Sequence, residues 1–306
     1  MLRYTVVRLF WALVTLVAVM FLVFVLTRFI GNPVNAILPL EASPAQRQLL
    51  THQLGLDQPV WKQTADFFAH AARGDFGQSW QQNTSALGIA MERLPYTLKL
   101  VFFAFVIAVV VGVPLGVICA LVAGTWLDRL LSSVSLIGVC LPNFWLGLML
   151  MMFFGVALHW LPTSGSEGFK ALIMPALSLA LMPIGRIALI IRSAMMEEMS
   201  QSYVLTARAK GLVEFLVVVR HALRNASIAL VTISGWELAR MLAGYTVAVE
   251  IVFAYPGIGH LIVDSIQSQD FPLVQAITLV VAVSISLINL LTDVSYALID
   301  ARIRFD

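Results

Sequence analysis

The chain has 306 residues, of which 60% are hydrophobic and 12% charged, and its mean hydropathy is +0.90. A typical soluble domain carries about twice that share of charged residues, so the composition excludes a protein that lies mainly in water. The formal net charge of +2 comes from basic residues scattered along the chain, which excludes a nucleic-acid-binding surface. We therefore expect one membrane domain with one long loop outside the membrane.

Six stretches are apolar over roughly the 20 residues that a membrane-spanning helix needs. Only internal hydrogen bonds satisfy the backbone in lipid, which favours helices there. The predicted spans are Leu9–Ile30, Tyr96–Val122, Leu131–Leu158, Leu172–Ile191, Ile228–Phe253 and Leu273–Leu298. The first is longer than the core of a signal peptide and no cleavage site follows it, so we expect it to be retained. Pro175 and Pro183 interrupt the fourth. The predicted fold is an all-α membrane protein of about six transmembrane helices.

A long polar stretch, residues 31–95, separates the first two predicted spans. Ser43–Pro44 is a typical N-cap and first-turn pair, and the run to Leu54 ends at Gly55, which predicts a short helix. A second helix is predicted over Pro59–Ala72. This loop either packs on the outer ends of the spans or docks a partner, and the sequence leaves both open.

Basic residues near the ends of spans mark the cytoplasmic side of a membrane protein. Here they stand before the first predicted span, in the second and fourth links, and after the last span. They are Arg3, Arg8, Arg129, Arg192, Arg208, Lys210, Arg220, Arg224, Arg302 and Arg304. An even number of spans also puts both termini on one side. We therefore expect both termini in the cytoplasm and the loop at residues 31–95 on the opposite side of the membrane.

The segment between the fourth and fifth predicted spans, about residues 193–227, is longer than a simple turn requires. A helix over residues 206–209, broken at Gly211 and then resumed, is expected to protrude there. Small side chains at its tip would let the backbone approach another surface closely. Arg208 and Lys210 could pair there with acidic residues of a partner. We name residues 193–227 the candidate coupling segment.

In this segment the sequence resembles the permease subunits of bacterial ABC importers, in the branch that carries dipeptides, oligopeptides, nickel and glutathione. That branch favours Thr-Ala-Arg-Ala-Lys-Gly followed by Arg-His-Ala-Leu-Arg-Asn-Ala, and both stand intact at residues 206–211 and 220–226. The wider superfamily has Glu-Ala-Ala, three residues, Gly, nine residues and Ile-x-Leu-Pro. This chain departs from that pattern at Leu205, His221 and Arg224.

Further landmarks of the same branch follow in its order along nearly the whole chain. They are Gly55-Leu-Asp-Gln-Pro59, Gly74-Asp-Phe-Gly77, Leu94-Pro-Tyr-Thr97, Pro142-Asn-Phe-Trp145, Leu161-Pro-Thr163, Tyr255-Pro-Gly-Ile-Gly259 and Asp270-Phe-Pro272. One of these words alone would be a weak signal. Their ordered combination is specific, and the chain is identified as similar to this branch over almost its full length.

The resemblance implies a bacterial inner-membrane protein with a type I importer-like permease core at residues 96–306. This core is preceded by a cytoplasmic N-terminus with the first helix at 1–30 and a periplasmic loop with short helices at 31–95. It also implies that the candidate coupling segment carries a coupling helix that seats in a cleft of an ATPase. The residues expected at that contact are Thr206, Ala207, Arg208, Ala209, Lys210, Gly211, Arg220 and His221. The implied partners are a second related permease subunit, two cytoplasmic ATPase subunits and a periplasmic substrate-binding protein.

The sequence has no Gly-x-x-x-x-Gly-Lys-Ser/Thr phosphate loop. We therefore expect a non-catalytic subunit with no cofactor of its own, and ATP and Mg bound by the partner ATPases. The five histidines are dispersed, so no metal site is predicted. The two cysteines lie in apolar runs, where a thiol behaves as a small hydrophobic group, so no structural disulfide is predicted.

Six polar or charged residues interrupt the predicted spans, where such groups are costly and usually face a protein interior or a water-filled path. They are Arg186, Glu237, Arg240, Glu250, Asn289 and Asp293. Glu237 and Arg240 are three residues apart and lie on one helix face. The set either lines the path or gate for a polar solute, or pairs internally to hold the bundle together, and the sequence leaves both open.

The sequence therefore predicts a permease subunit that forms half of the translocation pathway for a small polar solute. Short peptides are favoured as the commonest cargo of the branch, with glutathione and nickel or other metal chelates as alternatives. A stand-alone secondary transporter or channel would be expected to show inverted repeats, and the sequence shows no convincing internal repeat. A structural scaffold leaves the candidate coupling segment unexplained, and an exporter commonly has its ATPase fused to the spans.

Overall fold

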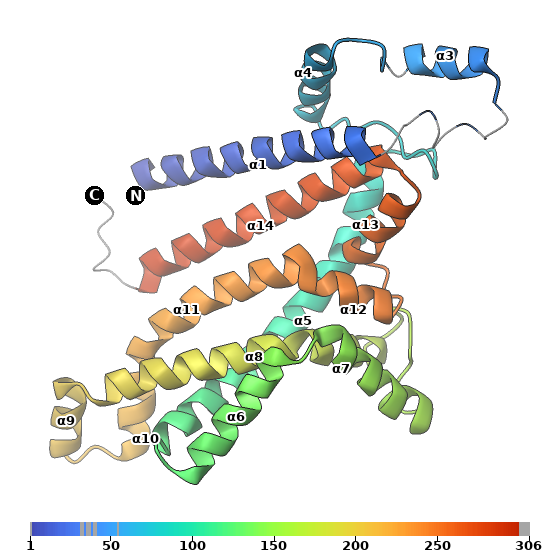
Figure 1. Cartoon of the computed structure of the whole chain (residues 1–306). Helices are drawn as coiled ribbons and strands as arrows, with labels where there is room; N and C mark the ends of the chain where they lie inside the picture. Colours follow the sequence, from blue (N-terminus) through green and yellow to red (C-terminus); the bar gives the residue numbers. More distant parts are fainter. Residues whose placement is uncertain (1, 31–33, 35–37, 39–41, 54, 300–306) are drawn as a thin grey trace. The chain divides into compact units, whose positions relative to one another are not determined.

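A computed structural model describes residues 2–30, 34, 38, 42–53 and 55–299. Over these residues the regular elements are helices, with one isolated bridge between Gln78 and Ser85 (Figure 1). The prediction of an all-α protein is thus confirmed. The helices form two compact units, which are Met1–Thr97 with Pro256–Ser286, and Leu98–Tyr255 with Leu287–Asp306.

Among the described residues, five helices are long and apolar enough to cross a membrane, and one bent pair of helices is a sixth candidate. The five are Val6–Thr27, Ala86–Leu121, Lys170–Met199, Glu214–Val252 and Phe271–Asp293. The bent pair is Trp126–Cys140 with Asn143–Ala157, and the two helices meet at 98°. The prediction of about six spans is confirmed.

The third predicted span, Leu131–Leu158, is not a single helix. α6 (Trp126–Cys140) ends before Leu141, whose ψ of 128° is extended, and α7 (Asn143–Leu150) begins after Pro142. A proline disfavours the helical conformation of the residue before it and has no N–H to donate, so the helix breaks there. α7 then continues into a π-helical stretch, η1 (Met151–Ala157).

The first unit contains α1, α3, α4, the start of α5, α13 and the start of α14. Their bounds are α1 (Leu2–Ile30), α3 (Pro44–Gln53), α4 (Val60–Ala71), α5 (Ala86–Leu121), α13 (Ile258–Gln267) and α14 (Phe271–Ile299). α3 and α4 confirm the two short helices predicted in the long loop, whereas α13 is a helix that the sequence analysis did not predict. The core of the unit is a cluster of buried residues: Phe76, Ala86, Ile89, Ala90, Ile258, Leu261, Leu273, Ala276, Ile277 and Val280.

Hydrogen bonds between sequence landmarks stabilise the first unit. Ser79 Oγ donates to Asp270 Oδ2 at 2.5 Å, and Leu273 N donates to Asp270 Oδ1 at 3.3 Å, so this carboxylate both caps the first turn of α14 and holds a distant loop. Thr97 Oγ1 accepts a bond of 2.8 Å from Ile258 N at the start of α13. Asp270 and Thr97 are 1% exposed, and we infer that these landmarks stabilise the fold.

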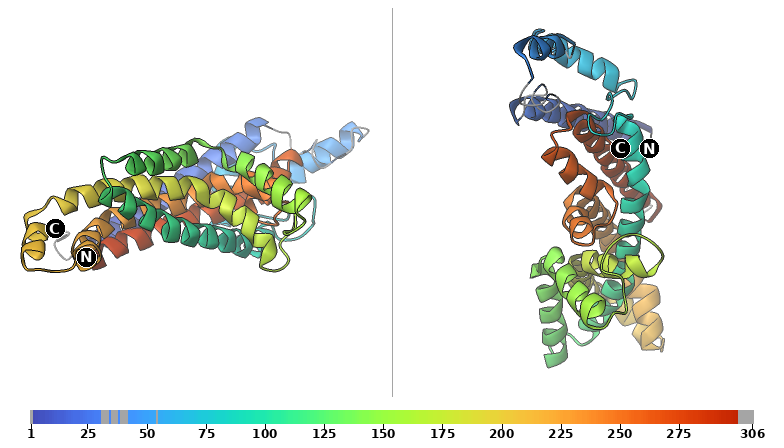
Figure 2. Two further views of the ribbon diagram at one scale, coloured as in Figure 1. Left: turned by 90° about the horizontal axis from the view of Figure 1, so that it is seen from below. Right: turned by 90° about the vertical axis from the view of Figure 1, so that its right-hand side faces the viewer.

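The second unit is built around α8 (Lys170–Met199), a helix that runs unbroken through both of its prolines and extends beyond the predicted fourth span. α6, α7 and α11 pack against α8, and the left view of Figure 2 shows α6 and α8 running side by side. The unit also contains η1, α5 from Leu98 onward and α14 from Leu287 onward. Its other elements are α9 (Ser202–Ala209), α10 (Glu214–Leu216), η2 (Val217–Ala222), α11 (Leu223–Arg240), η3 (Met241–Tyr245) and α12 (Thr246–Val252).

Glycines allow the backbones around α8 to approach closely. A methyl group added at Gly185 of α8 would lie 2.3 Å from the Ser135 carbonyl oxygen of α6, and one at Gly116 of α5 would lie 2.5 Å from the Ala188 carbonyl oxygen of α8. Small residues of this kind are typical of membrane helix interfaces, because packing rather than water exclusion drives helices together in lipid.

We expect Gly185→Ala to lower the melting temperature of the detergent-solubilised protein, because overpacking a tight contact costs about 1–3 kcal/mol. Gly138→Ala is the matched control on the same α6–α8 interface. A methyl group there would lie 3.5 Å from Leu181 Cδ1, which is an ordinary contact. Equal melting temperatures for the two variants would contradict the close approach.

Candidate functional site

The tip of the candidate coupling segment is a short helix that ends at a glycine. α9 covers Ser202–Ala209, and Gly211 follows it with φ of +77°, a left-handed conformation that favours glycine. The Gly211 N–H donates to the Arg208 carbonyl oxygen at 2.9 Å and closes the last turn. The sequence predicted this break. The chain resumes as α10 at Glu214.

An ion pair closes the turn between α9 and α10. Arg208 Nη2 lies 2.6 Å from Glu214 Oε1, and Arg208 Nε lies 3.1 Å from Glu214 Oε2. The guanidinium that was expected to meet a partner therefore already has a carboxylate within the chain. The side chains of both residues are more than one-third exposed, so the pair shapes the turn and adds little stability.

The base of α9 is held by Tyr203. Its hydroxyl donates to Glu198 at the end of α8 and accepts a bond of 2.8 Å from Asn225 Nδ2 in α11. Burial, followed by the bond to Glu198, raises the pKa of the Tyr203 phenol above its ordinary value, so the hydroxyl keeps its proton at neutral pH. These bonds fix α9 between α8 and α11, and the sequence analysis did not single out Tyr203 or Asn225 for this role.

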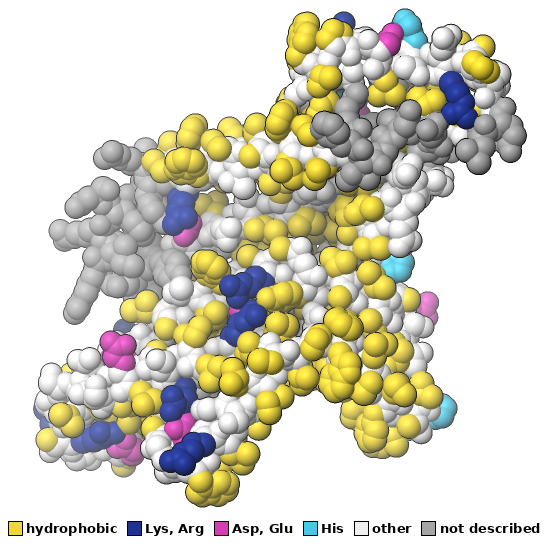
Figure 3. Space-filling model, viewed as in Figure 1, with side chains coloured by type: hydrophobic (Ala, Val, Ile, Leu, Met, Phe, Trp, Pro, Cys, Tyr) yellow, Lys and Arg dark blue, Asp and Glu magenta, His cyan; other side chains and the backbone are white. Residues whose placement is uncertain are grey.

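Buried and exposed residues divide α9 and the turn after it into two faces. Ala207 is 5% exposed and packs with Val204 and Val217, so it fixes α9 on η2 and is not available at the surface. Residues 208–216 are all exposed, and Phe215 at 73% is the most exposed apolar side chain among them. Figure 3 shows basic and acidic side chains together in the region of α9 and α10.

The other expected contact residues lie on both sides of this tip. Thr206, Ala209, Lys210 and Arg220 are exposed, and His221 is half-buried. Arg220 and His221 belong to η2, the π-helical stretch that packs against α9. The structure therefore brings most of the expected residues to the α9 end of the unit and places Ala207 inside it.

Three of the six intramembrane polar residues form one cluster near the middle of the spans. Arg186 Nη1 of α8 lies 3.1 Å from Glu237 Oε1 of α11, and Arg240 Nη1 lies 3.4 Å from the same oxygen. Arg186 Nη1 also donates to the Tyr245 hydroxyl at 3.1 Å. Glu237 is fully buried. Internal pairing, one of the two alternatives for these residues, is thus what the geometry displays for these three.

The other three residues differ in burial. Glu250 in α12 is fully buried, Asp293 in α14 is 9% exposed, and Asn289 in α14 is exposed.

Hydrogen bonds connect the helix break at Pro142 to η3 and α8. Asn143 Nδ2 donates to the Tyr245 carbonyl oxygen at 2.9 Å, and Ser178 Oγ donates to the Asn143 carbonyl oxygen at 2.5 Å. Tyr245 closes the π-helical stretch η3, and π-helical turns are frequent at functional sites. One short region therefore contains a helix break, a π-helical turn and the Arg186–Glu237 ion pair.

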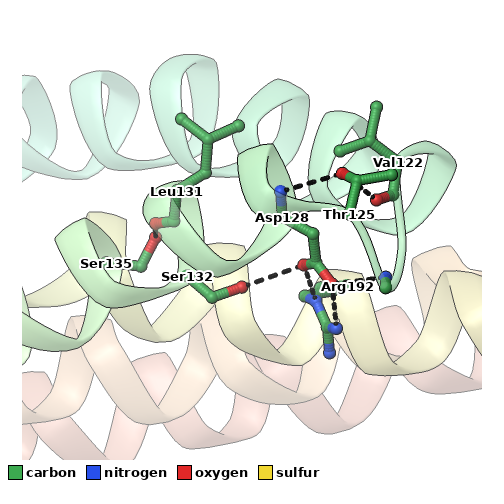
Figure 4. Close-up of polar contacts among 8 residues, drawn as sticks. Val122, Thr125, Asp128, Leu131, Ser132, Ser135 and Arg192 are labelled. Atoms are coloured by element: carbon green, nitrogen blue, oxygen red, sulfur yellow. Dashed lines mark hydrogen bonds and ion pairs between the residues drawn. The ribbon is translucent and has the colours of Figure 1, made fainter.

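A second buried ion pair, which the sequence analysis did not identify, joins α6 to α8. Figure 4 shows Asp128 facing Arg192, with Nε 2.6 Å from Oδ1 and Nη2 2.7 Å from Oδ2. Thr125 Oγ1 caps the helix by accepting from the Asp128 N–H at 3.3 Å. The spacing of a threonine and an acid three residues later resembles a capping box, and this signal was available in the sequence.

Comparison with known proteins bears directly on the function. Residues 112–305 match the family described as "Binding-protein-dependent transport system inner membrane component", and residues 1–101 match the description of its N-terminal part. The chain belongs to this family. It is therefore the permease subunit of an ABC importer and a multi-pass inner-membrane protein, as the sequence predicted.

Individual relatives and one fold agree with this assignment. The chain is 38% identical over 306 residues, the whole of both chains, to the glutathione transport system permease protein GsiC of Escherichia coli (strain K12). It is 36% identical over 304 residues, 96% of each chain, to a protein of Brucella abortus (strain 2308) whose name places it in a peptide transport system as a permease. A structure of the MetNI methionine ABC transporter matches the fold with a TM-score of 0.60 at 18% identity, covering 69% of this chain and 96% of that one.

We expect Glu237→Gln to destabilise the protein strongly, because removing one member of a buried ion pair typically costs about 3–5 kcal/mol. Arg240→Gln is the milder comparison, since 41% of the Arg240 side chain is exposed and Glu237 keeps Arg186. Unfolding in detergent, together with transport, measures both. Normal assembly of Glu237→Gln with loss of transport would instead assign Glu237 to the solute path.

Proposed function

We propose that this subunit forms half of the path for a short peptide or a peptide-like solute, and that α9 with the turn at Gly211 transmits ATP-driven movement to the spans. The observation that carries the proposal is the exposed tip, residues 208–216. It presents apolar side chains, Phe215 above all, to water at the end of a helix that is fixed at its base. An exposed apolar patch rimmed by charges is typical of a protein-binding surface.

The proposed partners are a second, related permease subunit, two ATPase subunits that bind ATP and Mg, and a substrate-binding protein. Membership of a binding-protein-dependent family implies the last two kinds. The N- and C-termini and the α9 tip lie in the cytoplasm in this proposal, and residues 31–95 lie in the periplasm. The distribution of basic residues near the span ends supports this orientation. Catalysis belongs to the ATPases, and this chain contributes no catalytic residue.

The proposed solute is inferred from the names of the relatives. One is named for glutathione, itself a tripeptide, and another for peptides. A nickel or other metal chelate is the second candidate, from the resemblance described above. The binding protein is expected to select among them, so the cargo is best identified through its stimulation of ATP hydrolysis.

We expect Gly211→Pro and Arg208→Glu each to reduce co-purification of the ATPases by about tenfold, which corresponds to about 1.4 kcal/mol of binding free energy and is typical of an important interface residue. Proline cannot adopt the φ of +77° at position 211, and a glutamate at 208 would face Glu214. The measurement is ATPase retention on the tagged permease in detergent. It is followed by ATP hydrolysis with the binding protein loaded with glutathione, trialanine or a nickel–histidine chelate.

The matched control is Gly168→Pro, the same change at a glycine with φ of +75° in the link before α8, outside the candidate coupling segment. We expect this variant to retain the ATPases. If Gly211→Pro and Arg208→Glu bind the ATPases and respond to the loaded binding protein as the native chain does, the assignment of this segment is wrong.

A further inference from the structure

The Asp128 carboxylate has a complete set of fixed donors. Arg192 approaches side-on, with Nε at 2.6 Å and Nη2 at 2.7 Å, so both carboxylate oxygens are held by one planar group. Gly124 N donates to Oδ2 at 2.9 Å and Ser132 Oγ donates to Oδ1 at 3.2 Å (Figure 4). Asp128 is only 4% exposed. This geometry fixes both the distance and the rotation of the guanidinium.

The position of the pair matters because Arg192 stands where α8 approaches the tip. About two helical turns separate Arg192 from the end of α8 at Met199, and α9 begins at Ser202. Asp128 belongs to the first turn of α6, directly after the turn that joins α5 to α6. The pair therefore connects α8, just before the candidate coupling segment begins, to the hairpin formed by α5 and α6, where Asp128 lies 64 residues earlier in the sequence.

The helices on either side of the pair are packed too tightly to slide independently. Methyl groups at Gly112 and Gly116 of α5 would lie 2.9 Å and 2.5 Å from carbonyl oxygens of α8, and one at Gly185 would lie 2.3 Å from an α6 carbonyl oxygen. Ile191 and Met195, which flank Arg192 on α8, are fully buried. Packed interfaces of this kind shift as units and do not deform continuously.

The Arg208–Glu214 pair differs from the Asp128–Arg192 pair in sequence separation and exposure. It is six residues apart in sequence, exposed on both sides and confined to the tip. The Asp128–Arg192 pair spans 64 residues, and its carboxylate is buried, although 28% of the Arg192 side chain is exposed. Only the second can make separate helices move together.

We propose that Asp128 and Arg192 are positioning residues for coupling, which make the end of α8 move with the α5–α6 hairpin when the ATPases displace α9. Without the pair, the last two turns of α8 would bend or twist alone, and ATP hydrolysis would proceed with little movement of α5 and α6. The inference rests on the proposed function of α9 and adds the route by which its movement reaches the spans.

The test uses the complete transporter in proteoliposomes, with glutathione and trialanine as parallel probes, and compares Asp128→Asn and Arg192→Lys with Arg129→Gln. Arg129 is the exposed basic neighbour of Asp128 and serves as the matched control. We expect Asp128→Asn to keep the ATPases bound and hydrolysing ATP while solute transported per ATP falls about tenfold. Arg192→Lys, which keeps the charge but loses the planar fork, should fall less, and Arg129→Gln should match the native ratio.

A fluorescent reporter gives a second reading that needs no solute. With Cys119 and Cys140 replaced by alanine, a thiol-reactive dye on Trp126→Cys reports the surroundings of α6, where Trp126 is 73% exposed. ATP with vanadate should change the emission in the native background and leave it unchanged with Asp128→Asn. If Asp128→Asn does not assemble, Arg192→Lys is judged on the same two readings.

An unchanged transport-to-ATP ratio and an unchanged dye response in the assembled variants would overturn the inference. That failure is distinct from failure of the proposed function. The Gly211→Pro and Arg208→Glu variants decide whether α9 binds the ATPases at all, whereas the Asp128 and Arg192 variants are judged only on complexes that retain them.

Discussion

The close approach of backbones around α8 is the constraint on which the second unit depends. Lipid provides no hydrophobic drive between helices, so contact must come from packing and from internal polar bonds. Gly185 and Gly116 bring the backbones of α6 and α5 against α8. The Asp128–Arg192 pair joins α6 to α8 across one of these close contacts. A helix so enclosed is expected to shift together with its neighbours, because close-packed interiors transmit strain.

The buried polar residues of this chain connect different pairs of segments. Asp270 and Thr97 join segments of the first unit, and Asn143 fastens the helix break at Pro142 in the second. Glu237 joins α8 to α11 through Arg186. In each of these cases the side chain satisfies a backbone group or a buried charge, which is costly to leave unpaired in an apolar setting.

The sequence predicted the helical elements well, because their signals are local, and predicted the contacts between them poorly, because those depend on how the helices pack. Span positions follow from composition, and the turn at Gly211 follows from glycine's conformational range, so both could be read locally. The 98° bend at Pro142 could not, because prolines at 175 and 183 leave α8 unbroken and only packing distinguishes the cases. The ion-pair partners of Arg186 and Arg208 also depend on which helices meet. The sequence analysis considered only an acidic residue of another protein as the partner of Arg208 and did not consider Glu214 of the same chain.

The closed turn at Arg208 and Glu214 has a consequence for the kinetics of assembly. A loop that must order when it docks loses conformational entropy at that moment, which weakens binding. Here the turn is already shaped by its own ion pair and by glycine, and α9 is anchored at Tyr203. The surface is therefore preorganised. In the proposed contact with an ATPase, docking would therefore cost little ordering entropy, and the lifetime of the complex should follow the fit of Phe215 and its neighbours.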